Sequence, residues 1–249
     1  DHAKRNPDDG DTTSRTWLRS VHTLALEPEV FDRDYVVYRG DGTRATKAYK
    51  TWAADNADRD LLKLDEYESA KRVADIVRSH PVAGPLVTGN GESEVSIFWT
   101  DPDTGLKCKG RADRIADQPD GSIVLADLKT VDSVDARHFG RMAAQNGWHG
   151  QLAHYRDGIA QSRGIDIDKI GVCIIAAESK APHDVGVFVL DPDGSLWAGD
   201  EMRKDLLSRL AECVERDEWP GRHSGAVPLD LPEWAYPDTD DLFTIGGPS

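Results

Sequence analysis

Cysteine is scarce in this sequence, with three residues among 249, and the three lie far apart. Cys108, Cys173 and Cys213 form no C-x-x-C pair, and their number is odd. This pattern excludes a disulfide framework and does not fit a zinc or iron–sulfur site built on cysteine. We therefore expect a reducing, cytoplasmic compartment.

Long apolar runs and excess positive charge are also missing. No run approaches the ~20 apolar residues that span a bilayer, so no membrane association is expected. The chain has 30 Lys and Arg against 45 Asp and Glu, a net charge of −15. This charge argues only weakly against nucleic-acid binding, because exposed charges are screened over ~8 Å and a local basic cleft can still attract phosphate. No G-x-x-x-x-G-K-[ST] loop is present, which argues against ATP-driven unwinding.

Apolar residues make up 39% of the chain, and 7 Trp, 6 Tyr and 5 Phe can anchor a core. The alternation of apolar residues predicts a three-stranded meander over 94–99, 107–115 and 122–130. Further strands are expected at 35–38, 170–177 and 185–190, and helices at 12–26, 65–80, 135–145, 149–161 and 196–216, whereas much of 29–60 follows no clear period. This order predicts a mixed α/β (α+β) fold, with a central mixed sheet flanked by helices.

The ends of the chain differ in composition from the middle. The polar segment 1–11 is predicted to be disordered, a single domain to cover 12–219, and the segment 220–249 to form an extended or mobile tail. Within that tail, residues 238–243 form an acidic–aromatic peptide, which we interpret as a docking segment for a partner.

Asp113 near the end of one predicted strand and Asp127-Leu128-Lys129 at the end of the next carry the main chemical signal. Asp127 and Lys129 project to the same side, because residues i and i+2 of a strand share a face. Pairing of the two strands would bring Asp113 near Asp127, and two carboxylates can share Mg²⁺, which prefers oxygen ligands. The D-x-K tripeptide alone is more often a surface ion pair worth ~0–1 kcal/mol.

The wider set of motifs resembles the PD-(D/E)XK nuclease superfamily, in particular exonucleases of the RecE-like, exodeoxyribonuclease VIII type in the RecB-like group. No single motif is specific for this superfamily, but the ordered set of motifs over roughly residues 12–235 is specific. The matching segments are Val21–Pro28, Glu92–Trp99, Gly110–Asp113, Ala126–Thr130 and Gly147–Tyr155. The chain departs from the family pattern at Ala112, where proline is frequent, and at Leu18, where a small residue is usual.

The resemblance implies a set of site residues. The metal ligands would be His22, Asp113, Asp127 and the backbone carbonyl of Leu128, although a lone histidine on an apolar helix face is more often a core residue. The catalytic residues would be Lys129, Asp127 and Asp113, together with Gln151 and Tyr155, which match the Q-x-x-x-Y helix of RecB-like members and share a helix face.

Charged residues near these motifs are further candidates. Arg111, Arg114, Arg137 and Arg141 are predicted to line a DNA-binding cleft for phosphates. A solvated helix face explains Arg137 and Arg141 equally well. Glu92 and Glu94 begin a strand near the site and could supply a ligand to a second metal ion, but exposed strand-end carboxylates are the commoner explanation.

The resemblance further implies a Mg²⁺-dependent exodeoxyribonuclease, with Mn²⁺ as a substitute, that resects double-stranded DNA ends 5′→3′ for phage-type recombination. The implied partners are DNA ends, a single-strand annealing protein and further copies of the chain in a ring, in the cytoplasm of a bacterial or phage-infected cell. Two alternatives remain open: a catalytically silent DNA-binding or scaffold protein with the same fold, and a metal-dependent hydrolase of another phosphate substrate.

Overall fold

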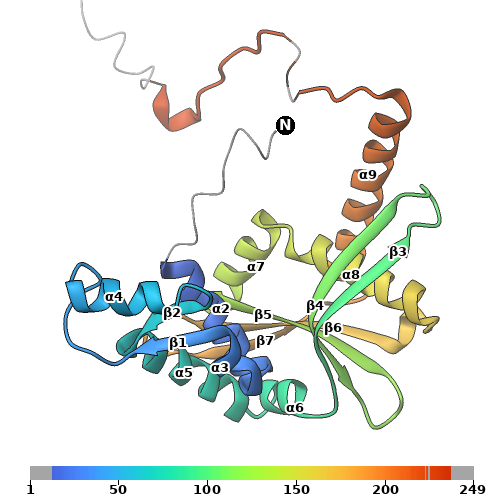
Figure 1. Ribbon diagram of the computed structural model, residues 1–249. Coiled ribbons are helices and arrows are strands. Elements are labelled where there is room, and N and C mark those ends of the chain that lie inside the picture. Colours follow the sequence, from blue (N-terminus) through green and yellow to red (C-terminus); the bar gives the residue numbers. More distant parts are fainter. Residues whose placement is uncertain (1–12, 222, 224, 237–249) are drawn as a thin grey trace, which may run out of the picture. The chain divides into compact units, whose positions relative to one another are not determined.

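A computed structural model of the chain describes residues 13–221, 223 and 225–236 (Figure 1). Contacts between Cα atoms divide the chain into one unit that ends at Arg209 and a second that starts at Leu210, within helix α9 (Ser195–Arg216). The segment 1–11 and the docking peptide predicted at 238–243 lie outside the described residues. Across the part that is described, no helix is long and apolar enough to cross a membrane.

The first unit is built on a five-stranded sheet with the strand order β3-β4-β5-β6-β7. The expected meander is confirmed, since β3, β4 and β5 are antiparallel neighbours, and β5 then pairs with β6 in parallel. This is the central mixed sheet flanked by helices that the sequence predicts (Figure 1). The strands are β3 (Gly91–Thr100), β4 (Lys107–Asp117), β5 (Ile123–Val131), β6 (Ile170–Glu178) and β7 (Val185–Val189).

Strand β5 lies between two apolar cores. Its residues Ala126 and Leu128 pack with α2 (Thr13–Leu26), α5 (Leu64–Ser79) and α6 (Ala83–Thr88). Ile123 and Leu125 pack on the other side, with α7 (Ala136–Gln145) and α8 (Trp148–Arg163). Burial of each large aliphatic side chain contributes about 1.5–3 kcal/mol, so Asp127 and Lys129 are placed on a strand that both cores hold fixed.

The segment 39–60, which the sequence pattern left unassigned, completes a small β-α-β unit. Strands β1 (Tyr35–Tyr38) and β2 (Asp60–Lys63) pair in parallel, and α4 (Lys47–Asp55) connects them. Thr46 caps α4 by accepting a hydrogen bond from the backbone of Tyr49. Three aromatic rings, from Tyr38, Tyr49 and Trp52, pack β1 against α4 with centroids 5.0–5.5 Å apart. The remaining short helices are η1 (Pro28–Val30), α3 (Phe31–Asp34), η2 (Ile167–Lys169) and η3 (Glu233–Ala235).

The β3–β4 hairpin continues beyond the rest of the sheet (Figure 1). Strand β4 pairs with β5 only over its last residues, from Arg114 to Asp117, whereas its pairing with β3 extends out to Thr100 and Lys107. The outer half of the hairpin therefore packs on α8 and has no β5 neighbour.

A buried arginine fixes the tip of this hairpin. Arg203 of α9 has one guanidinium nitrogen 3.1 Å from Asp101 Oδ2 and 3.4 Å from Asp157 Oδ2, and the other 2.9 Å from Asp200 Oδ1. Asp101 lies in the β3–β4 turn and Asp157 in α8, so one cation joins three elements. Such a group is buried only when its charge is paired.

Candidate metal centre

Three carboxylates come from adjacent strands at a point where the backbone ladders are interrupted. The β3–β4 register pairs the residues on either side of Glu94 and Asp113 but omits these two. The β4–β5 register ends at Arg114 and Ala126, one step before Asp113 would meet Asp127. The sheet therefore opens at a row formed by Glu94, Asp113 and Asp127, which we call the carboxylate row.

Glu94 has a backbone conformation that is unusual for its residue type. Its φ of 54° lies in the left-handed region, which favours glycine. Strain of this kind costs of order 1–3 kcal/mol and is concentrated at functional sites. In this chain, the residue with the left-handed backbone is the one whose carboxylate lies beside Asp113.

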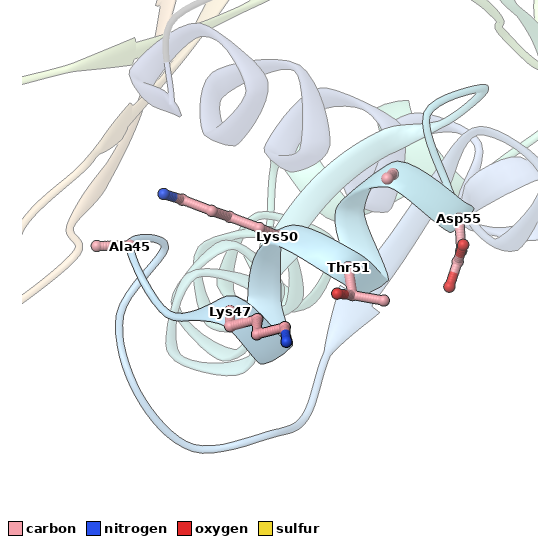
Figure 2. Close-up of a pocket in the computed structure, with 6 residues that line it drawn as sticks. Ala45, Lys47, Lys50, Thr51 and Asp55 are labelled. Atoms are coloured by element: carbon pink, nitrogen blue, oxygen red, sulfur yellow. The ribbon is translucent and has the colours of Figure 1, made fainter.

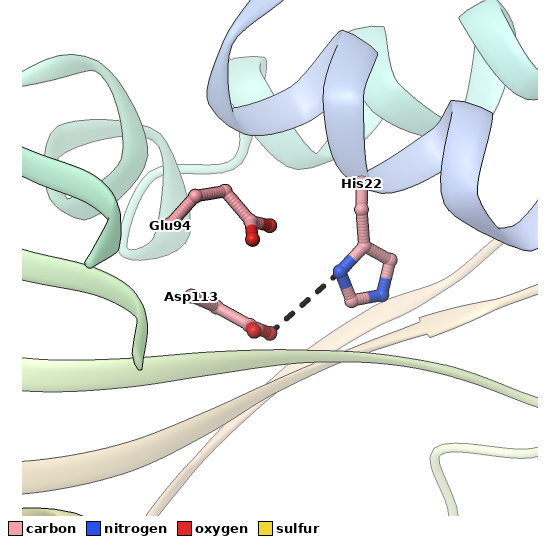
Figure 3. A group of neighbouring side chains, drawn as sticks. All are labelled: His22, Glu94 and Asp113. Atoms are coloured by element: carbon pink, nitrogen blue, oxygen red, sulfur yellow. Dashed lines mark ion pairs between the residues drawn. The ribbon is translucent and has the colours of Figure 1, made fainter. Parts of the chain in front are cut away.

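His22 of α2 completes the group from the helical side of the sheet. Figure 3 shows the side chains of His22, Glu94 and Asp113 pointing toward one another. One ligand atom from each of them lies within 4.8 Å of the others. His22 Nδ1 is 3.6 Å from Asp113 Oδ2. One imidazole nitrogen and two carboxylates at this spacing can share a divalent cation. The structure thus brings together His22 and Asp113, as the sequence predicts, and adds Glu94 to them.

Asp113 also bridges the gap between β4 and β5. Its Oδ2 accepts a hydrogen bond of 2.9 Å from the backbone N–H of Leu128, which replaces a missing ladder contact. The contact seen at Leu128 therefore involves its N–H group, and a metal-ligand role for its carbonyl stays a prediction.

Asp127 is buried, and one of its oxygens has spare bonding capacity. Its side chain is 2% exposed, and Oδ2 forms an ion pair with Lys129 Nζ at 2.5 Å. Beyond this ion pair, Oδ2 accepts no hydrogen bond from the described residues. A carboxylate oxygen has two lone pairs, so a cation held between Asp113 and Asp127 could bind Oδ2 together with Lys129.

The electrostatics of the carboxylate row point the same way. Burial raises the pKa of Asp127 to about 6, and the neighbouring charge of Asp113 adds to this shift. Burial likewise raises the pKa of Asp113 and of Glu94, and burial and Lys129 lower the pKa of His22. Without a cation, the site therefore favours protonated carboxyl groups and a neutral His22. A bound divalent ion would instead favour the ionised form of the carboxylates. The residues present fit such an ion.

Helix α8 contributes an aromatic neighbour to Lys129. The Nζ atom of Lys129 lies 5.7 Å from the ring centroid of Trp148, a cation–π distance. Trp148 falls within a segment that carries the family resemblance, but its role is not visible in the sequence, because a tryptophan beside a helix start is most often a core residue.

Gln151 and Tyr155 form the pair that their spacing predicts. Gln151 Nε2 donates a 3.2 Å hydrogen bond to Tyr155 Oη. The Tyr155 ring packs against Gly110 of β4, where a Cβ atom would lie only 2.6 Å from the ring. Within the described residues, no hydrogen bond joins this pair to the carboxylate row, so its catalytic role stays a prediction.

The four predicted DNA-binding arginines differ in their surroundings. Arg111 is exposed, and its Nε lies 2.6 Å from Glu94 Oε2. Arg137 and Arg141 are exposed one turn apart on α7.

The prediction for Arg114 is wrong. Arg114 is only 6% exposed, and its guanidinium donates to the carbonyls of Leu86 and Gly89 and to the hydroxyl of Ser93. Its side chain turns toward α6, where it satisfies backbone carbonyls instead of facing solvent.

Two other features do not join the site. Glu92 forms an ion pair with Arg163 of α8, at the base of the hairpin. Figure 2 shows a shallow pocket of about 560 Å³ on α4. Lys47, Lys50 and Asp55 line it, with Ala45, Thr51 and Ala54, and none of the predicted site residues does.

Comparisons with known proteins identify a family and a shared fold. Residues 12–228 match the family described as "PDDEXK-like domain of unknown function (DUF3799)". A crystal structure of a candidate exonuclease from Eubacterium rectale has a TM-score of 0.51 and 17% identity, over 97% of this chain and 84% of that one, which indicates a shared fold. The structure of SSO0001, at a TM-score of 0.35 and 16% identity over 85% of this chain and 88% of that one, adds no support. No curated protein matches the sequence. The match over most of the chain shows that this protein belongs to the PDDEXK-like domain family.

Proposed function

We propose that this protein is a Mg²⁺-dependent exodeoxyribonuclease, with Mn²⁺ as a substitute, that resects double-stranded DNA ends in the 5′→3′ direction. The observation that carries the proposal is the group of His22, Glu94 and Asp113, whose ligand atoms lie within 4.8 Å of one another, with the buried Asp127–Lys129 ion pair on the neighbouring strand. Membership of a PDDEXK-like family and the fold shared with a candidate exonuclease support it.

Each residue of the site has a chemical task in this proposal. His22, Asp113 and Asp127 would hold Mg²⁺, with Glu94 or the Leu128 carbonyl as a further ligand. When bound, Mg²⁺ would polarise the phosphodiester and make an attacking water more acidic. Lys129 would stabilise the negative charge that develops on the phosphate and orient the attacking water. The water oxygen bonds to phosphorus in line with the departing 3′-oxygen, which leaves a 5′-phosphate.

Digestion of linear duplex DNA tests the proposal. The substrate is labelled separately at its 5′ and 3′ ends and compared with closed circular DNA, in Mg²⁺ and in EDTA. We expect Mg²⁺-dependent loss from the 5′ ends alone, and no loss with Asp127→Ala. Asp168→Ala is the matched control, because Asp168 is an aspartate whose side chain is 90% exposed.

Two results would contradict the proposal. Full activity of Asp127→Ala would place the chemistry elsewhere. Intact DNA with the wild-type protein in both Mg²⁺ and Mn²⁺ would favour the silent DNA-binding alternative.

The recombination role extends the proposal to partners. Resected ends expose single strands, which a single-strand annealing protein would bind, and a ring of several copies would keep the enzyme on its substrate. Light scattering on the purified protein tests the ring, and a single-copy mass would contradict it.

A further inference from the structure

The outer half of the β3–β4 hairpin has one face that is exposed within the described part of the chain. Along both strands, exposed residues alternate with residues that pack inward. The inward side chains include Ile97 and Trp99, which belong to the core formed with α8. The six exposed positions are Ser96, Phe98 and Thr100 on β3, and Lys107, Lys109 and Arg111 on β4. We call these six positions the hairpin face.

The hairpin face is positively charged, although the chain as a whole is acidic. Three of its six positions are Lys or Arg and none is Asp or Glu, in a chain with a net charge of −15. The three cations occupy alternate positions of one strand, about 7 Å apart at a rise of roughly 3.4 Å per residue. Arg111 forms an ion pair with Glu94, so Lys107 and Lys109 supply most of the net positive charge of this row, which suits a phosphate backbone.

Phe98 lies beside this row, on the neighbouring strand β3, with most of its ring in solvent. Its exposed fraction is 69%, and the cross-strand register places it opposite Lys109. A large exposed aromatic ring next to a row of cations is the combination that single-stranded nucleic acids bind, because bases stack on the ring while cations follow the phosphates. A duplex, whose bases are already stacked, gains little from such a ring.

The hairpin face leads to the carboxylate row. Ser96 is two residues from Glu94 on β3, and Arg111 is two residues from Asp113 on β4, so the hairpin face ends next to the interrupted part of both strands. A direct contact joins the two regions, since Arg111 Nε lies 2.6 Å from Glu94 Oε2. A strand that follows the hairpin face would therefore reach the candidate metal centre.

We propose that the hairpin face binds a single DNA strand and guides it to or from the metal centre, with Lys107, Lys109 and Arg111 on its phosphates and Phe98 stacked on a base. This inference rests on the proposed nuclease function, which gives the strand its destination. It assigns the binding of unpaired DNA to residues outside the catalytic group.

The test measures binding of a fluorescent oligo-dT and of a blunt duplex of equal length by anisotropy, in EDTA so that no cleavage occurs. Lys107→Gln/Lys109→Gln is compared with Lys47→Gln/Lys50→Gln, which removes the same charge from the α4 pocket of Figure 2. We expect only the hairpin variant to lower the slope of log K against log salt for oligo-dT, by about 1.4 for two phosphate contacts.

The aromatic contact is tested separately. Phe98→Ala should weaken oligo-dT binding by about tenfold without a change in the salt slope, because stacking is not ionic. Phe98→Tyr should keep wild-type affinity. The matched control is Val189→Ala, which trims another exposed apolar side chain on β7, the strand at the opposite edge of the sheet.

The outcomes separate this inference from the proposed function. Unchanged oligo-dT binding by the hairpin variants, or an equal loss for oligo-dT and duplex, would overturn the inference even if the protein cleaves DNA. Selective loss for oligo-dT supports the inference, and absence of DNA cleavage by the same wild-type protein would then reject only the nuclease proposal.

Discussion

Replacing Gly110 by alanine tests whether the approach of α8 to β4 sets the activity. An added Cβ would lie 2.6 Å from Cδ1 and 2.7 Å from Cε1 of Tyr155. Carbon atoms in ordinary contact are about 3.5–4.0 Å apart, so the tyrosine ring must move by about 1 Å. Overpacking of this kind lowers the free energy of unfolding by about 1–3 kcal/mol. A 1 Å displacement of a catalytic group costs about 10²-fold in rate, so we expect a loss of that order in kcat.

The assay is single-turnover cleavage of end-labelled duplex DNA, with thermal denaturation to confirm folding. Gly171→Ala on β6 is the matched control, because its Cβ would meet nothing closer than 3.6 Å and should leave both measurements unchanged. Tyr155→Phe, which removes only the hydroxyl, separates loss of that group from displacement of the ring. Wild-type kcat in a folded Gly110→Ala protein would refute the reasoning, since it would show that the position of Tyr155 does not matter.

Three further perturbations follow from the site. The raised pKa of Asp127, about 6 against an ordinary 3.8, means that the folded metal-free protein binds a proton more tightly than the unfolded chain. This stabilisation is complete below pH 3.8 and is lost as the pH rises through 6. The Tm of Asp127→Asn, measured relative to wild type, should therefore increase between pH 4 and pH 7.5. A Tm difference that stays constant over this range would contradict the prediction. Trp148→Leu should lower kcat by about 5- to 30-fold, because a cation–π contact of about 1–2 kcal/mol is lost. Trp148→Phe should recover part of the lost activity. An equal loss of kcat when Trp148→Leu is added to Lys129→Met would show that Trp148 does not act through Lys129. Arg114→Met should lower the free energy of unfolding in urea by at least about 2 kcal/mol, because buried carbonyls lose their hydrogen-bond donor. If the variant instead reduced the salt dependence of DNA binding, Arg114 would contact a DNA phosphate as first predicted.

Much of the fold was predictable because the strands and helices that cover the two cores have regular apolar periods. Apolar alternation placed β3, β4 and β5 in the correct order, and helical spacing found α2 and α5. Strand β1 was predicted at 35–38, but α4 and β2 were not, because α4 buries little beyond Tyr49 and its surface is charged. Its packing depends on rings contributed by different elements, which local periodicity does not reveal.

The site was predictable to a similar extent. The resemblance placed His22 and Asp113 together, whereas the sequence offered Glu94 only as a ligand to a second metal ion. Its position beside the other two residues depends on an unusual φ that no sequence pattern encodes. Arg114 shows the opposite limit. Its neighbours in the sequence suggested a phosphate contact, but its side chain binds the carbonyls of Leu86 and Gly89, which precede β3.

The buried Arg203 cluster has a consequence for recognition as well as for the fold. A two-stranded ribbon without a third strand would ordinarily fluctuate, and a ligand that ordered it would lose binding free energy to that ordering. Here Asp101 ties the tip of the ribbon to α9 and α8, and Glu92 ties its base to Arg163. Contacts at both ends thus hold the ribbon in place before any ligand binds. When the ribbon binds a flexible DNA strand, the binding free energy then has to offset only the conformational entropy that the DNA loses.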